Sequence, residues 1–289
     1  MIVSELIAET QHMLYGVHRG NLNFTAQALD DEDTDFSLAD DPKGVAQGTL
    51  LSVDDELMLV RQASQSSKTV TVKRGWLGTE QVEHTAGSLV EVNPRFPRIE
   101  VRRALRDEIR SWGTGMFQVI TEFVDITSST RSVDLSVFDE GWFHILRATR
   151  TARTGSDADV AVRFRTHTAS ADHPFGSLVL EEAPGAAVTL SITVAAPFSV
   201  GEFTDDLDLN EDIGLEESMF DIPKIGACWR LLSPREINRL DTTAQDEPRS
   251  AADVQAGMIA ATARGYKQLR DTRLADESTR LRGRWPWRF

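Results

Sequence analysis

Residues 69–92 read Thr69-Val-Thr-Val-Lys-Arg-Gly-Trp-Leu-Gly-Thr-Glu-Gln-Val-Glu-His-Thr-Ala-Gly-Ser-Leu-Val-Glu-Val92. A short β-branched run covers Thr69 to Val72, glycines interrupt the residues that follow, and a second apolar run starts at Leu89. β-Branched residues favour strands, whereas glycine and polar residues favour turns. The stretch therefore predicts two strands of a small sheet that are joined by a long, ordered loop.

The residues before this stretch continue the same pattern. Apolar residues alternate with polar ones at Leu22, Phe24 and Ala26. Short apolar runs at 49–53 and 57–61 flank Asp54-Asp55-Glu56, which predicts a hairpin turn. Five or six short strands between residues 21 and 96 predict a compact, β-barrel-like domain.

The order of these elements resembles a small β-domain of neck (head–tail connector) and tail proteins of tailed bacteriophages. The resemblance rests on an Arg-Gly-x-x-Gly-Thr loop at 74–79, a His-x-x-Gly sequence at 84–87, and the acidic loop, strands and turns that precede them. It covers residues 20–93 and, more loosely, the charged C-terminal helix. It implies a head–tail adaptor of a siphovirus-like phage, which is a structural protein of the virion and not an enzyme.

Composition is ordinary for a soluble protein, with 40% hydrophobic and 26% charged residues among 289. No apolar run approaches the roughly 20 residues of a membrane helix, and the first residues lack the pattern of a signal peptide. No membrane contact is therefore predicted. Cys228 is the only cysteine, which excludes an intrachain disulfide and is typical of synthesis in a reducing compartment, here the host cytoplasm.

The formal net charge of −14 argues against DNA binding by the whole surface. Seven acidic residues lie between Asp30 and Asp41, and eight lie between Glu202 and Glu217. From Arg264 onward the sign reverses, with eight basic residues against three acidic ones. An acidic body with a basic C-terminal arm favours contact between copies or with an acidic partner, although a solvated helix face gives the same pattern.

The predicted fold class is α+β and mainly β, with a small N-terminal β-barrel-like domain, a central antiparallel β-sandwich and a long C-terminal helix. Alternating residues predict the sandwich, whose immunoglobulin-like and jelly-roll versions cannot be distinguished because strand order is not readable. The predicted segments are an N-terminal helix (1–20), the small β-domain (21–96), a linking helix (97–114), the sandwich with an acidic loop (115–232), and C-terminal helices with an Arg/Trp tail (233–289).

The C-terminal part carries three further predictions. Residues 223–232 are expected to form one more strand. Ser233-Pro-Arg-Glu236 has the pattern of a capping box with proline at the first helical position, and it predicts a short helix through Leu240. The longest helical pattern runs from Ala251 to about Gly283, which is roughly 50 Å of helix if unbroken.

Two sets of residues are candidate contact sites. Tryptophan and arginine are frequent at interface hot spots, so the tail is a candidate for docking to a portal or a neighbouring subunit. Its residues are Arg280, Arg284, Trp285, Trp287, Arg288 and Phe289. The acidic loops are candidates to face a DNA channel, where like charge keeps passing DNA from adhering. Their residues are Asp31, Asp33, Asp35, Asp206 and Asp208.

No catalytic, cofactor or metal site is predicted. The six histidines show no metal-ligand spacing, and no phosphate-binding loop or nucleophile elbow is present. The acidic loops share the aspartate spacing of calcium-binding loops, but Phe36 and Glu211 stand where an EF-hand needs glycine. His84 is expected to be structural, with its ring bonded to loop backbone.

The resemblance to phage neck proteins implies that this protein is a neck adaptor in the virion. It would form a homo-oligomeric ring of about twelve copies, a dodecamer, closed by heterologous contacts. Its partners would be the portal protein and further neck or tail proteins, with transient, non-specific proximity to packaged DNA. The alternative is a tail-tip or baseplate protein whose sandwich binds host glycan through Trp142, Phe143 and His144, residues that equally suit a core. A hydrolase hidden in the sandwich ranks last.

Overall fold

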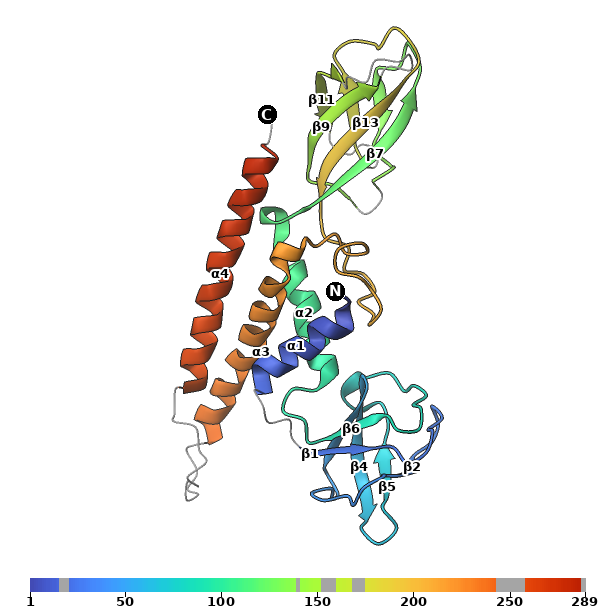
Figure 1. The fold of residues 1–289 in the computed structure, drawn as a ribbon, viewed down its shortest axis with the longest axis vertical. Coiled ribbons are helices and arrows are strands. Elements are labelled where there is room, and N and C mark those ends of the chain that lie inside the picture. Colours follow the sequence, from blue (N-terminus) through green and yellow to red (C-terminus); the bar gives the residue numbers. More distant parts are fainter. Residues whose placement is uncertain (16–20, 139–140, 152–159, 168–174, 243–257, 287–289) are drawn as a thin grey trace. The chain divides into compact units, whose positions relative to one another are not determined.

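The computed structural model describes residues 1–15, 21–138, 141–151, 160–167, 175–242 and 258–286 (Figure 1). The fold is α+β, with 32% of residues in helices and 30% in strands, which confirms the predicted class. The chain divides into two compact units. Unit 1 comprises Met1–Glu108, Phe203–Asp206 and Asp221–Arg270, and unit 2 comprises Ile109–Glu202, Leu207–Phe220 and Asp271–Phe289.

A six-stranded antiparallel sheet forms the small β-domain of unit 1. Its strands are β1 (Asn21–Phe24), β2 (Asp35–Ser37), β3 (Leu50–Val53), β4 (Glu56–Ser64), β5 (Thr69–Lys73) and β6 (Leu89–Val92), in the order β1-β6-β3-β4-β5-β2. The sheet curls until its two edges meet, because Thr25 after β1 bridges Leu38 after β2. The Ala26 amide also donates to the Ser37 carbonyl at 2.9 Å. The predicted barrel-like domain is therefore present.

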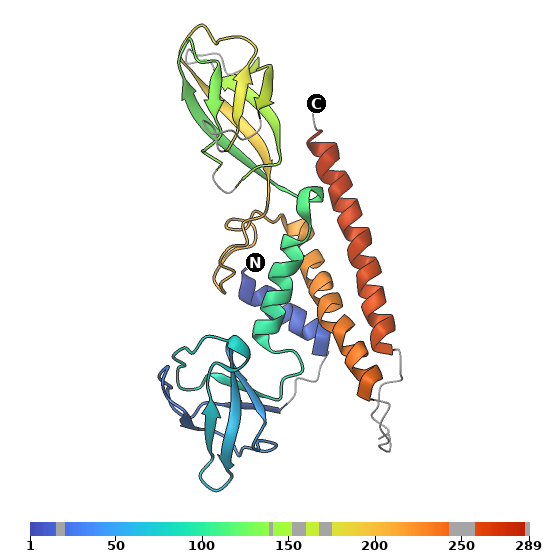
Figure 2. The ribbon, with the colours of Figure 1, turned by 180° about the vertical axis from the view of Figure 1, so that it is seen from behind.

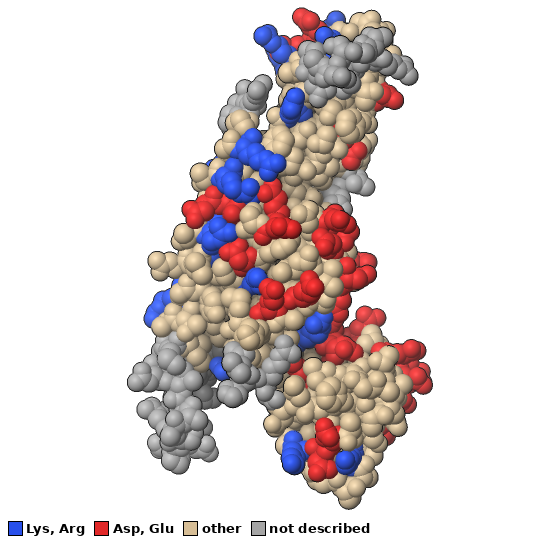
Figure 3. Space-filling view, viewed as in Figure 1, with Lys and Arg blue, Asp and Glu red and all other residues tan. Residues whose placement is uncertain are grey.

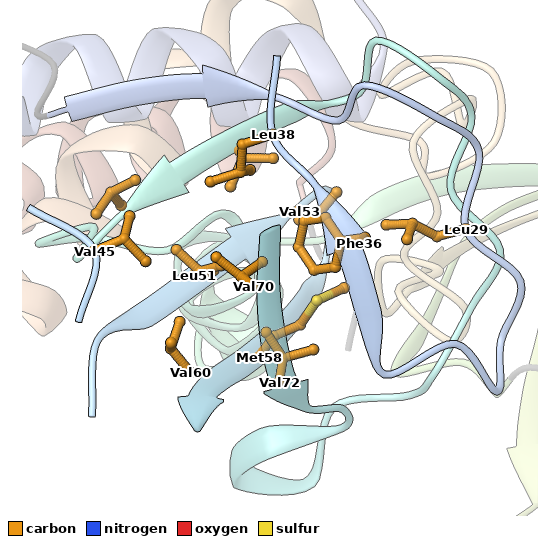
Figure 4. Close-up of a cluster of buried hydrophobic side chains, with 12 residues drawn as sticks. Leu29, Phe36, Leu38, Val45, Leu51, Val53, Met58, Val60, Val70 and Val72 are labelled. Atoms are coloured by element: carbon orange, nitrogen blue, oxygen red, sulfur yellow. The ribbon is translucent and has the colours of Figure 1, made fainter. Parts of the chain in front are cut away.

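Alternating residues of the strands fill the interior of this domain. Met58 and Val60 on β4 and Val70 and Val72 on β5 are all buried, and Phe36 on β2 packs with them (Figure 4). Their period of two is the pattern expected of strands with one face on a core. The remaining buried members are Leu29, Leu38, Val45, Leu51, Val53, Val90 and Val92.

Strand β1 reverses the predicted orientation of its side chains. Leu22 and Phe24 are 43% and 44% exposed, whereas Asn23 and Thr25 are buried. The two polar side chains face inward because the loops supply partners for them. Asn23 exchanges two hydrogen bonds with the backbone of Asp40, at 3.2 and 3.0 Å. The hydroxyl of Thr25 donates to a backbone carbonyl of the 84–88 loop.

The described residues also form four α-helices: α1 (Val3–Tyr15), α2 (Arg98–Arg110), α3 (Asp221–Thr242) and α4 (Met258–Arg284). In unit 1, α1 packs against α3, and the Lys224 ammonium group pairs with Glu9 at 2.7 Å. The long C-terminal helix is confirmed from Met258 onward. Residues 243–257, which include the predicted start of that helix, lie outside the described residues.

Helix α3 corrects two predictions. Residues 223–232 are helical and not a strand, and Pro234 lies inside the helix and not at its start. The buried residues Ile222, Ile225 and Leu232 recur at helical spacing, a signal that the short apolar run concealed. Ser233 does not cap a new helix, because its hydroxyl donates to the Trp229 carbonyl one turn earlier.

The β-sandwich of unit 2 has two antiparallel sheets (Figures 1 and 2). One has the order β10-β9-β13-β7 and the other has the order β11-β12-β8. Their strands are β7 (Gln118–Ile126), β8 (Ser132–Asp134), β9 (His144–Thr151), β10 (Val160–Ala161), β11 (Phe164–His167), β12 (Ser177–Leu180) and β13 (Val188–Ala196). Apolar residues from both sheets form one core, among them Leu178, Leu190, Ile192 and Val194. The predicted sandwich is therefore present.

The acidic segment, predicted as a long loop over residues 201–222, is shorter than predicted. Residues 201–216 contain neither a helix nor an extended strand, but a short 3-10 helix follows at Glu217–Met219 and α3 begins at Asp221. In unit 2 the segment is anchored by three fully buried side chains, Leu209, Ile213 and Leu215. Gly214 has φ +80°, and a side chain there would overlap that of Gln118. Residues 207–216 are thus packed into unit 2 through these apolar side chains, whereas Phe203–Asp206 belong to unit 1.

Candidate functional site

A buried network of ionisable side chains lies in the small β-domain, within the stretch that decides the fold. Glu56 begins β4, Arg74 follows β5, and His84 lies in the loop before β6. The side chains of Glu56 and His84 are fully buried, and that of Arg74 is 2% exposed. The Arg74 guanidinium donates to both Glu56 carboxylate oxygens at 2.7 Å, which is a bidentate, charge-assisted pair.

The same groups hold three loops in place. Arg74 also donates to the carbonyls of Asp30 at 2.7 Å, Asp33 at 3.0 Å and Val82 at 2.6 Å. The Gly75 amide donates to Glu56 at 3.0 Å. Because buried charges are costly unless they are paired and hydrogen-bonded, this near-complete satisfaction is what allows the network to exist.

His84 completes the network through its ring and its backbone. The ring nitrogens contact Asp54 at 2.9 Å and Glu56 at 3.0 Å, and the amide and carbonyl pair with Leu29. The prediction that the ring binds loop backbone is wrong, because the ring binds two carboxylates. Its structural role is nevertheless what the geometry shows.

The electrostatics of the network favour its charged form. Burial alone would raise the pKa of Glu56, but hydrogen bonds from His84, Arg74 and the Gly75 amide lower it to about 2. Burial alone would lower the pKa of His84, but its contacts with Asp54 and Glu56 outweigh burial and raise it. A carboxylate with such a low pKa is a poor general base near neutral pH. The network is therefore built to hold loops.

Glycines shape the loop that this network secures. Gly75 has φ +60° and Gly78 has φ +76°. A side chain on Gly75 would also approach the Thr79 carbonyl oxygen to 3.1 Å. Glycine adopts such backbone angles at little steric cost, so the two glycines of the Arg-Gly-x-x-Gly-Thr sequence are explained by backbone geometry.

The sequence contained an overlooked signal for this network. Glu56 shares the face of Met58 and Val60, and Arg74 shares the face of Val70 and Val72, because residues two apart point the same way along a strand. The side chains of Met58, Val60, Val70 and Val72 are all buried. Two side chains of opposite charge that point into the same core are expected to form an ion pair. Alternation along each strand predicts that Glu56 and Arg74 both point inward, and the pairing of β4 with β5 then brings them together.

A second buried carboxylate, Glu108, joins helices in unit 1. It accepts hydrogen bonds from Arg230 of α3 at 2.7 Å and from Arg270 of α4 at 2.5 Å. Both guanidinium groups lie within 6 Å of the Trp229 ring centroid, which adds cation–π attraction. A Cβ on Gly226 would overlap the Glu108 carboxylate, so the glycine leaves the space that the carboxylate fills.

The candidate docking residues divide into two groups. Arg280 and Arg284 pair with Glu216 of the same unit at 2.7 and 3.3 Å, so they already serve the chain's own tertiary structure. Trp285 is half-buried. The remaining candidates, Trp287, Arg288 and Phe289, lie outside the described residues.

The candidate channel residues are also not equivalent. Asp31 is exposed, whereas Asp33 accepts a hydrogen bond from the Asp30 amide and Asp35 accepts one from Thr71. Figure 3 shows acidic side chains gathered on the side of the small β-domain where Figure 1 places β2.

The second acidic loop carries its own hydrogen bonds. The Thr204 hydroxyl lowers the pKa of Asp206. The Glu211 and Asn210 amides lower the pKa of Asp208. Backbone turns of this kind explain the spacing of these acids without a bound cation.

The aromatic residues considered for glycan stacking are engaged in the sandwich. Trp142 packs against its core, and the indole N–H donates to the Phe175 carbonyl at 2.8 Å. Phe143 and His144 are half-buried. These contacts leave Trp142 with a structural role in unit 2.

Comparisons with known proteins do not identify a family for this chain. No protein-family model matches the sequence, and no curated protein is significantly similar to it. Within the described residues, no group of three or more His, Cys, Asp and Glu side chains is arranged to hold a metal ion. In the same part of the chain, every helix is too short or too polar to cross a membrane.

Proposed function

We propose that this protein is a structural adaptor of a tailed phage particle, situated in the neck between portal and tail. The observation that supports the proposal most is the use made of the motif residues. The side chains of Arg74, His84 and Glu56 bond to one another and hold the loops of the small β-barrel in place. Gly75 and Gly78 shape the turns of the same domain. These motif residues stabilise the fold of the domain. A virion protein that forms a ring depends on such a stable fold, because the same surfaces must meet in every copy.

The adaptor closes a ring through repeated heterologous contacts, in which one surface of each copy meets a different surface of the next. Its outer charges assist DNA passage, because an acidic channel wall repels the phosphate backbone. The exposed Asp31 is better placed for that role than Asp33 and Asp35, which make hydrogen bonds within the chain. Docking to the portal falls to Trp285 and residues 287–289, since Arg280 and Arg284 already pair with Glu216 of the same chain.

The mass and symmetry of the purified full chain test the ring. Native mass spectrometry and particle images should show a closed ring of about twelve copies, and a trimer would contradict the proposal. Portal docking is tested separately by deleting residues 285–289. The truncated chain should fold but fail to bind portal, whereas the control Arg61→Ala, a change at an exposed arginine of β4, should bind as the unaltered chain does. Binding by the truncated chain would refute the docking role of the tail.

A further inference from the structure

The sandwich of unit 2 leaves the edge of one long strand uncovered. Strand β7 is the outermost strand of its sheet, and among the described strands it pairs with β13 alone, over nine residues and without a bulge. It contains neither proline nor lysine, two residues that commonly keep an exposed edge from pairing. Phe123 of this strand is 67% exposed. An edge of this length offers its backbone N–H and C=O groups to a further strand.

A second edge lies on the opposite side of the sandwich (Figures 1 and 2). Strand β10 pairs with β9, and β11, which follows β10 after two residues, pairs with β12; both are the outermost strands of their sheets. Val162 and Phe164 pack against the core, whereas Arg163 and Arg165 are exposed. Residues 162–167 therefore form a basic edge whose side chains alternate between core and solvent.

The two edges run in opposite directions. Strand β7 is antiparallel to β13, β13 is antiparallel to β9, and β9 is antiparallel to β10. Strands β7 and β10 are therefore antiparallel, and the chain continues from β10 into β11 without a turn. Neighbouring copies in a ring of many copies are turned only slightly relative to each other. The β7 edge of one copy can therefore meet residues 162–167 of the next copy as an antiparallel strand.

One register of this pairing matches the side chains on both edges. When Asp125 lies opposite Arg163, a carboxylate faces a guanidinium group, which stabilises a cross-strand pair. The same register sets Phe123 opposite Arg165, and a guanidinium group over an aromatic ring adds cation–π attraction. Side chains that face the core then also meet, and most of them are apolar. The remaining opposed residues are Ile126 with Val162, Val124 with Phe164, Glu122 with Thr166, and Thr121 with His167.

We propose that β7 of one copy pairs with residues 162–167 of the next copy. Charge favours this partner over β7 of a second copy, because β7 carries two acidic residues, Glu122 and Asp125, and no basic one. Two β7 strands would bring four carboxylates together without a counter-charge. The contact rests on the proposed function, because it joins two different surfaces of successive copies, as a closed ring requires.

A charge swap in the full chain tests the contact. Asp125 and Arg163 are exposed in the single chain, so Asp125→Arg and Arg163→Asp should retain the fold, which circular dichroism verifies. Each change alone sets like charges opposite each other and should raise the concentration needed for half-assembly about tenfold. The chain with both changes should recover assembly, because the pair is restored with its signs exchanged. Arg147→Asp, at an exposed arginine of the interior strand β9, is the matched control and should assemble as the unaltered chain does.

Hydrogen exchange distinguishes strand pairing from a contact between side chains alone. Along β7, successive amides alternate between bonding to β13 and pointing to the free edge. In the assembled full chain, the amides that point to the edge should exchange at least about tenfold more slowly than in the chain dissociated by dilution. The amides that bond to β13 serve as the internal reference. Edge amides that remain unprotected in the ring would overturn the proposed pairing.

The outcomes separate this contact from the ring itself. If the unaltered chain forms a ring and neither single change weakens it, the contact is refuted while the proposed function stands. Assembly that is lost in the single variants and not recovered in the double variant also refutes the pairing, as does a dimer that Arg163→Asp leaves intact. Copies that join with protected β7 edges but never close into a ring support the contact and overturn the ring. A chain that stays monomeric overturns both.

Discussion

The replacement Glu56→Gln tests whether the small β-domain depends on its buried charge pair. Glutamine keeps the size of the side chain but removes its charge and turns one acceptor into a donor. In the unaltered chain Glu56 accepts hydrogen bonds from the Arg74 guanidinium and from the backbone amides of Gly75 and Val82. In the variant, the new amide donor faces one or more of these donors. The variant leaves Arg74, which is 2% exposed, without a counter-charge.

Two independent estimates give the size of the effect. Removing one member of a buried ion pair costs about 3–5 kcal/mol. The pKa of Glu56 falls from an ordinary 4.5 to about 2, and at 1.36 kcal/mol per pH unit that corresponds to about 3 kcal/mol. Because the folded pKa is depressed, this stability is present above pH 4.5 and is lost as the pH falls toward 2.

Hydrogen exchange on the full chain measures the loss where it occurs. The amides of Leu29 and His84 bond to each other's carbonyls, so their protection reports on the loop that the network holds. In Glu56→Gln they should exchange at least about a hundredfold faster at neutral pH. Glu83→Gln, a change at an exposed carboxylate of the same loop, should exchange as the unaltered chain does.

An acid titration provides the second readout. The unaltered domain should lose stability between pH 4.5 and 2 in urea unfolding, and Glu56→Gln should lose markedly less over that range. Equal protection in the two chains, or an equal acid response, would refute the reasoning that the pair carries this stability.

Three further predictions concern other buried groups. The pKa of His84 is raised in the folded chain, so its contribution to the free energy of unfolding is complete below pH 6.5 and is lost as the pH rises through the folded pKa. In urea unfolding, His84→Gln should make this loss of stability with rising pH smaller. An unchanged pH dependence would contradict the prediction. Gly226→Ala should lower the free energy of unfolding by about 2 kcal/mol or more, because its methyl group meets Glu108. Gly265→Ala, with open space around it, should be neutral or stabilising by up to about 1 kcal/mol, and equal effects of the two changes would refute the overlap. Burial raises the pKa of the Cys228 thiol to about 12, so iodoacetamide at pH 8 should modify it only after unfolding, and rapid labelling of the native chain would show that the thiol is accessible.

Local pattern was sufficient for most elements of secondary structure. Period-two alternation located the strands of both β-regions, and helical spacing located α1, α2 and the end of α4, because these patterns depend on residues a few positions apart. The same reasoning failed for residues 223–232. A short apolar run is compatible with a buried strand or a buried helix segment, and α3 is decided by the helices that bury it.

By itself, the sequence determined the fold class, the barrel-like domain, the sandwich and the long C-terminal helix, since each follows from periodicity within one segment. Only the tertiary structure decided how the charges are used. Glu56 and Arg74 are 18 positions apart, and Glu108 and Arg270 are 162 apart. Which face of β1 turns inward depends likewise on loops that supply partners for Asn23 and Thr25. Pairing and burial at such separations are set by the packing of the whole chain, which no local pattern encodes.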